Sequence, residues 1–162
     1  MLALRYASVL ALTIWLGGLL VLGAIAAPAV FDVIGARPLG GDRMLAGAIF
    51  GEILRRFHLL TYGCGVVVFG SLLVRGVLGP RPTMFAVRLG LAFLMLVATA
   101  YSGLVVSRQI VRAQEQIGAA PSTLPEDDPR RAAFGRLHAR STALQLVPII
   151  GGLFLLFREL RD

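Results

Sequence analysis

The sequence predicts an all-α membrane protein, folded as an antiparallel four-helix transmembrane bundle. Of its 162 residues, 57% are hydrophobic and only 15% are charged, whereas about a quarter of the residues in soluble domains are charged. Four stretches contain no charged residue: 6–31, 59–74, 89–107 and 141–157. A membrane crossing takes roughly 20 helical residues, and flanking Arg or His side chains can extend the two shorter stretches. We therefore expect a single domain, 1–162, with spans at about 7–31, 57–77, 84–107 and 139–158.

Turn and capping residues place the first two helices at about 3–34 and 43–78. Gly35 and the Pro38 to Gly41 stretch supply turn residues after the first helix. Asp42 is an expected N-cap, because its carboxylate can accept a hydrogen bond from the first turn of the second helix. The prolines of the 79–82 segment cannot continue that helix.

The last two helices are expected at about 83–117 and 129–160, with 121–128 as the longest irregular loop. Pro129 suits the first position of the fourth helix, with Asp128 as its cap. Pro28 and Pro148 should kink their helices. Short links favour up-and-down packing, so the helices should extend beyond the lipid at the end with the first and third loops. We call this end the head, and the end with both termini the base.

Small residues should mark close helix contacts, where lipid gives no hydrophobic drive for association. A homo-oligomer that assembles through these small-residue faces is a further candidate. These residues are Gly17, Gly18, Gly23, Ala27, Gly63, Gly70, Gly151 and Gly152.

All 16 basic residues are arginines. They lie beside apolar runs, so their expected partner is the lipid bilayer rather than nucleic acid. Ten belong to the head and six to the base, and we expect many head arginines to be paired with acids and the base arginines to be mostly unpaired. Unpaired arginines close to lipid favour cytoplasmic termini in a multi-pass cell-membrane protein. The base set is Arg5, Arg75, Arg81, Arg88, Arg158 and Arg161.

Two polar stripes near the head carry the only two histidines, His58 and His138. Residues three or four apart share a helix face, and polar groups at this depth should face other helices or water. We expect the stripes to converge, with both imidazoles on the inner side of the bundle around a shared cavity. The candidate ligand-binding residues are Glu52, Arg55, His58, Tyr62, His138, Ser141 and Gln145.

Several other interpretations of these residues stay open. The histidines could be interfacial anchors, they could hold a haem, or they could bind copper or zinc with Glu52 as a third ligand. A small-solute transporter or channel subunit is a further alternative. No hydrolase elbow, phosphate loop or zincin motif occurs, so we expect a non-enzymatic protein without a cofactor. Trp15 should pack in the core, and Thr99, Tyr101 and Ser102 should satisfy their hydroxyls within or between helices.

Short motifs in the first, second and fourth helices resemble one family. They are Trp15-Leu-Gly-Gly18, Ala27-Pro28-Ala-Val-Phe31, Ala46-Gly-Ala-Ile-Phe50 and Phe134-Gly-Arg-Leu-His138-Ala-Arg-Ser141. The chain is similar to a bacterial membrane domain of unknown function related to the animal transmembrane protein 205 family. The resemblance implies a four-span bundle of the bacterial inner membrane with no established activity, and it gives no residue a catalytic role. A weaker likeness to copper-resistance membrane proteins rests on the Trp-Leu-Gly-Gly element alone.

Overall fold

The computed structural model describes residues 1–35 and 43–161, which form helices and no strand. The first long helix consists of α1 (Leu2–Val21), a π-helical turn η1 (Leu22–Ala26) and α2 (Ala27–Gly35). The wider turn precedes Pro28, whose ring would otherwise clash with the carbonyl four residues earlier. The predicted Asp42 cap and the turn at Pro38 to Gly41 lie outside the described residues.

The remaining three long helices confirm the expected positions within two residues. They are α3 (Arg43–Leu78), the continuous set α4 (Phe85–Tyr101), η2 (Ser102–Val106) and α5 (Ser107–Ile117), and α6 (Pro129–Arg161). The start of α6 is capped as predicted, because the backbone N–H of Arg130 donates to Asp128 Oδ1 at 2.8 Å. Between α5 and α6, Pro121–Thr123 forms one short 3₁₀ turn, η3.

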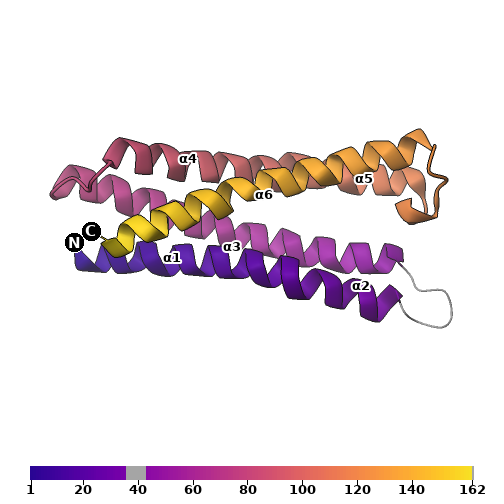
Figure 1. The fold of residues 1–162 in the computed structure, drawn as a ribbon, viewed down its shortest axis with the longest axis horizontal. Helices are drawn as coiled ribbons and strands as arrows, with labels where there is room; N and C mark the ends of the chain where they lie inside the picture. The colour runs from indigo at the N-terminus through magenta and orange to yellow at the C-terminus, as the bar shows by residue number, and fades with distance from the viewer. Residues whose placement is uncertain (36–42, 162) are drawn as a thin grey trace.

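The helices run up and down, and both termini lie at the same end in Figure 1. The helix α1 packs against α3 and α6, and α4 packs against the same two helices. The first and third long helices are therefore diagonal, as are the second and fourth. All four are long and apolar enough to cross a membrane. The predicted fold class, an all-α four-helix membrane bundle, is confirmed.

The apolar core fills the base half and the middle of the bundle. Its most buried large side chains are Leu12, Trp15, Leu72, Met95 and Leu155. Towards the head the packing is looser, since neither η1 nor α5 contributes a buried residue. The head halves of the helices are therefore held less tightly than the base halves.

The glycines divide into those that pack inside the bundle and those that do not. A Cβ at Gly18 would overlap Phe57, and one at Gly151 or Gly152 would lie 2.9 Å from Met95 Sδ or a Leu16 methyl carbon, so their predicted helix contacts are confirmed. A second group has no described atom within 4 Å of such a Cβ, so its predicted contacts do not form inside this chain. This group consists of Gly17, Gly23, Gly63 and Gly70. Whether these glycines mediate a homo-oligomer stays a prediction.

Candidate functional site

A small cavity with a mostly apolar surface lies between the four helices, deeper in the bundle than the predicted head site. Its volume is about 10 Å³, which is about the space that one water molecule requires. All four long helices contribute to its wall. The lining residues are Trp15, Leu19, Leu54, Phe57, His58, Thr61, Thr99, Ser102, Leu144, Gln145 and Pro148.

Three side chains in the cavity wall carry buried polar atoms without a hydrogen-bond partner among the described residues. These atoms are Trp15 Nε1, Thr99 Oγ1 and Ser102 Oγ. Their residues are 1%, 6% and 2% exposed, respectively, so surrounding solvent does not satisfy them. Leaving a buried polar group unsatisfied costs roughly 1–3 kcal/mol. Three such groups therefore belong to residues that line one cavity.

The His58 imidazole presents a defined tautomer to this region. Its Nδ1 lies 2.8 Å from the carbonyl oxygen of Leu54. A carbonyl can only accept, so Nδ1 carries a proton and donates, which leaves Nε2 as an acceptor in the neutral ring. Thr61 Oγ1 in turn donates to the carbonyl of His58 at 2.9 Å. The imidazole is thus held on α3 by one hydrogen bond to the backbone, and Thr61 bonds to the backbone carbonyl of the same residue.

A glycine in the π-helical turn η2 allows α3 to approach this part of the wall. A Cβ at Gly103 would overlap the hydroxyl of Tyr62 and would lie 2.8 Å from His58 Cδ2. The π-helical turn begins at Ser102, next to that contact. Such turns often occur at functional sites, and here the absence of a side chain at Gly103 brings His58 and Tyr62 against it.

A proline on α6 frees the backbone carbonyl of a residue that lines the cavity. Pro148 has no backbone N–H, so the carbonyl of Leu144 loses its usual helical donor. Both residues line the cavity, together with the amide side chain of Gln145. No Asp, Glu, Lys or Arg from the described part of the chain lines it. The residues of the wall therefore carry no formal charge when His58 is neutral.

The expectation that His138 shares a cavity with His58 is wrong. His58 is 7% exposed and lines the cavity, whereas His138 is exposed and does not. The first buried residue of α6 is Ser141. His138 precedes it by about 4.5 Å along the helix axis, in the part of α6 that contributes no buried residue.

Glu52 and Arg55 also lie away from the cavity. Arg55 donates to both carboxylate oxygens of Glu52 at 2.7 and 2.8 Å, and Arg56 Nε donates at 2.7 Å. Hydrogen bonds from Arg55 and then Arg56 lower the pKa of Glu52, outside the apolar span, to about 2. Each residue turns a helix by about 100°, so three residues fall about 60° short of a full turn. Six residues separate Glu52 from His58, which places their side chains about 120° apart around the helix axis. These head arginines are paired, as predicted.

The structure brings only part of the predicted set together. His58 and Gln145 line the cavity, and Tyr62 stands beside His58 with ring centroids 6.1 Å apart. Ser141 is buried but is not part of the wall. The sequence interpretation missed Trp15, which was expected to pack in the core, and Thr99 and Ser102, whose hydroxyls were expected to be satisfied within or between helices. A usable signal was present, because Thr99 and Ser102 are three residues apart on one helix face.

The haem and metal alternatives find little support in this geometry. Two axial histidines must face one cofactor, but only His58 faces inward, and the cavity volume is far below that of a porphyrin. No group of three or more His, Cys, Asp or Glu residues in the described ranges could hold a metal ion. Glu52, the proposed third ligand, is occupied by its arginines.

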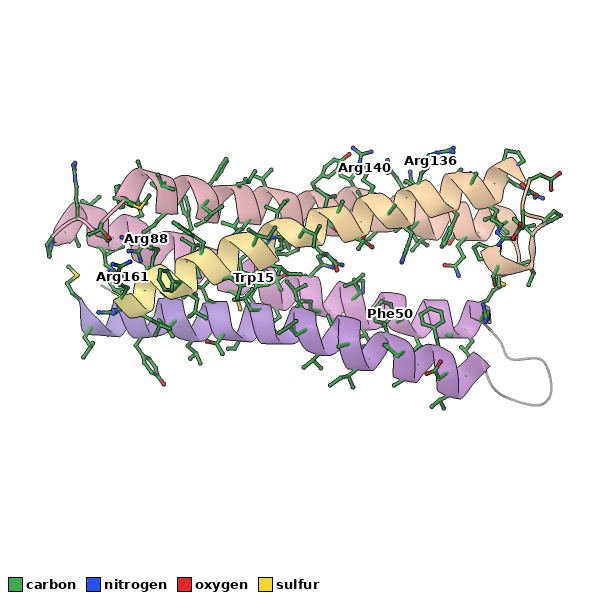
Figure 2. All side chains as sticks on the ribbon, in the orientation of Figure 1. Trp15, Phe50, Arg88, Arg136, Arg140 and Arg161 are labelled. Atoms are coloured by element: carbon green, nitrogen blue, oxygen red, sulfur yellow. The ribbon has the colours of Figure 1, made fainter. Side chains whose placement is uncertain are left out.

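A second buried polar region lies at the base, and the sequence interpretation missed it. Glu159 of α6 accepts hydrogen bonds from Arg75 Nη1 at 2.8 Å to each carboxylate oxygen, and from Arg88 Nη2. Arg5 Nε donates to the backbone carbonyl of Glu159 at 2.8 Å. Figure 2 shows Arg88 at the end of the bundle with the termini and Trp15 nearer the middle. The expectation of mostly unpaired base arginines is therefore wrong for Arg75 and Arg88.

The fold and these two polar regions define an integral membrane protein with a four-helix bundle. A family model described as a domain of unknown function (DUF4149) matches residues 10–119, and the chain belongs to this family. The matched region includes Trp15, His58, Thr99 and Ser102 of the cavity, and it ends before α6. Comparison with curated proteins finds no match, and comparison with solved structures finds none either.

Proposed function

We propose that this protein is a non-enzymatic membrane protein that binds a small neutral polar molecule in the cavity between its helices. The observation that carries the proposal is the set of three buried, unpartnered atoms in the wall: Trp15 Nε1, Thr99 Oγ1 and Ser102 Oγ. A bound molecule would supply the hydrogen bonds that they lack, which removes a desolvation cost that each would otherwise impose.

The chemistry of the wall selects the class of ligand. Trp15 can only donate, neutral His58 offers an acceptor at Nε2, and the hydroxyls can do both. An ion at this depth would lack a counter-charge in the wall, and a buried unpaired charge is very costly. The ligand is therefore neutral, and the present volume accommodates one water-sized molecule. A larger ligand would require the helices to separate, which the looser packing of the head half favours.

The surroundings of His58 support binding rather than catalysis. Its Nδ1 bonds to a backbone carbonyl, whereas a nucleophile–base pair needs a hydroxyl or thiol within hydrogen-bond reach of the base and often an orienting acid. No carboxylate lines the cavity within the described residues. These surroundings support the proposal of a non-enzymatic protein.

The single tryptophan gives a direct experiment, because it lies in the cavity wall. The purified protein in lipid nanodiscs is titrated with small neutral solutes such as urea, glycerol and formamide while Trp15 fluorescence is recorded. We expect a saturable change that Thr99→Val abolishes. Thr13→Val is the matched control, since Thr13 is exposed and bonds to its own helix at Val9. No saturable change with any solute, or equal loss in both variants, would refute the proposal.

A small-solute transporter or channel subunit is the second candidate function. The observation that favours it is the presence of two helix irregularities, the π-helical turn η2 and Pro148, at the cavity. Transporters bind substrate at interrupted helices near the middle of the membrane. Solute flux into proteoliposomes, compared between the native protein and Thr99→Val, separates this candidate from simple binding.

We also propose a relation to the transmembrane protein 205 family, a bacterial inner-membrane location and cytoplasmic termini. The family relation rests on the Phe134, His138 and Ser141 pattern. The orientation rests on the base arginines, where a single described acid, Glu159, faces Arg5, Arg75 and Arg88. At the head, Arg55, Arg56 and Arg130 pair with acids. Reporter fusions at the C-terminus test the orientation, and an external signal would reverse it.

A further inference from the structure

The base cluster joins all four long helices through one carboxylate. Arg5 belongs to α1, Arg75 to α3, Arg88 to α4 and Glu159 to α6. The carboxylate of Glu159 contacts Arg75 and Arg88 directly, while its backbone carbonyl accepts from Arg5. The cluster therefore fixes the position of two further guanidinium groups, on Arg5 and Arg75, at the base of the bundle.

Exposure increases in one direction across this cluster. The side chains of Arg88 and Glu159 are 0% and 2% exposed, that of Arg75 is 11% exposed, and that of Arg5 is 33% exposed. Arg88 and Glu159 thus form the inner part, and Arg75 and Arg5 form a rim. The rim lies where α1 begins and α3 approaches its end, at the level expected for lipid headgroups.

The rim arginines have hydrogen-bonding capacity left. Arg75 uses Nη1 for Glu159, and its Nε and Nη2 make no hydrogen bond within the described ranges. The bonds from Arg5 go to a neutral carbonyl, and its Nε is 4.0 Å from the nearest carboxylate oxygen. Its positive charge is therefore only weakly matched by Glu159. Two oriented guanidinium groups with spare donors form a suitable site for an anion.

We propose that Arg5 and Arg75 bind a phosphate group at the base of the bundle, the headgroup phosphate of an anionic phospholipid being one source and inorganic phosphate the other. Guanidinium groups match the geometry of phosphate oxygens through paired N–H donors. Glu159 acts as a positioning residue, because it holds Arg75 without occupying all of its donors. This site is separate from the central cavity and does not depend on the function proposed for it.

Native mass spectrometry of the full chain with equal amounts of phosphatidylglycerol and phosphatidylcholine tests this proposal. The native protein should retain phosphatidylglycerol in preference, and Arg5→Gln should reduce that preference about fivefold. Glutamine can still donate to the Glu159 carbonyl, so the fold should survive. Arg56→Gln is the control, since Arg56 is exposed at the head and bonds to Glu52, and it should leave the preference unchanged.

Two further arms complete the experiment. Added inorganic phosphate that displaces phosphatidylglycerol from the native protein identifies a site for free phosphate, whereas no displacement identifies the lipid headgroup as the ligand. If Arg5→Gln lowers the melting temperature, Arg5→Lys replaces it, because lysine keeps the charge without the planar fork and should reduce the preference less. Equal retention of the two lipids by the native protein, or equal loss in Arg5→Gln and Arg56→Gln, would overturn the proposal.

Discussion

The bundle contains two buried regions with polar side chains, and they differ in how those side chains are hydrogen-bonded. At the base, Glu159 is bonded at both carboxylate oxygens by arginines of neighbouring helices. In the central cavity, Trp15, Thr99 and Ser102 each keep an unpartnered polar atom among the described residues. The base thus joins helices through ion pairs between their own side chains. The cavity is instead lined by residues with buried polar atoms that lack a partner among the described residues, and such a region is suited to an external molecule.

The largest expected effect comes from removing the charge that joins the base. Glu159→Gln leaves buried guanidinium groups facing a neutral amide, and breaking a buried ion pair in this way costs about 3–5 kcal/mol. Thermal unfolding in detergent should show a large decrease in melting temperature. Glu52→Gln removes an exposed pair at the head and should change it little. An unchanged melting temperature for Glu159→Gln would show that the base cluster does not hold the helices together.

The contact between α3 and the π-helical turn is the next test. In Gly103→Ala the new methyl group would overlap Tyr62 and press on His58, and such overpacking costs about 1–3 kcal/mol. The matched control is Gly90→Ala, at a site with no described atom within 4 Å. Denaturant or thermal unfolding of the two variants measures the difference. Equal stability would mean that His58 and Tyr62 can move away freely.

Removing one cavity hydroxyl should change the stability less than the two substitutions above. The sign of the change shows whether the cavity holds a molecule. Thr99→Val keeps the shape of the side chain and deletes Oγ1, so a cavity with a bound molecule loses a hydrogen bond worth about 1 kcal/mol. A dry cavity would instead gain stability, because an unsatisfied polar group disappears. Unfolding of Thr99→Val, compared with Thr13→Val, distinguishes these cases. We expect destabilisation for Thr99→Val only.

The smallest effect concerns the cap of α6, outside the membrane. The side-chain hydrogen bond from Arg130, followed by its backbone N–H, lowers the pKa of Asp128 below its ordinary value. The stabilisation is therefore present above the ordinary pKa and is lost as pH falls through the lowered pKa. The amide resonance of Arg130 should report loss of the cap on acidification. Asp128→Asn keeps an acceptor that does not titrate. If the pH-dependent change of the Arg130 resonance persists in this variant, Asp128 is not its source.

The sequence predicted the helices well because local chemistry determines where they end. Pro129 and Asp128 begin α6 as expected, and Gly118 ends α5 with a positive φ of 66°. The composition of the apolar stretches likewise determined that these helices cross a membrane. These features depend on neighbouring residues in the chain and not on contacts between helices.

The site was harder to predict because it depends on the relative depth of different helices. Residue spacing predicted that His58 on its helix and Gln145 on another face the inside of the bundle, and both line the cavity. It could not show that the first buried residue of α6 is Ser141, or that His138 is exposed. It also could not show that Arg88 and Glu159, 71 residues apart, meet inside the bundle. Such pairs follow from the registration of helices and not from their periodicity.

The indole N–H of Trp15 tests the central claim most directly, because the chain contains one tryptophan and therefore gives one indole resonance. In a ¹⁵N-labelled sample in nanodiscs, we expect this resonance to exchange magnetisation with a long-lived bound water or added neutral ligand. Thr99→Val should weaken that transfer, and Thr13→Val should not. An indole resonance with no transfer from water or ligand, unchanged in Thr99→Val, would contradict the account of a ligand-binding cavity.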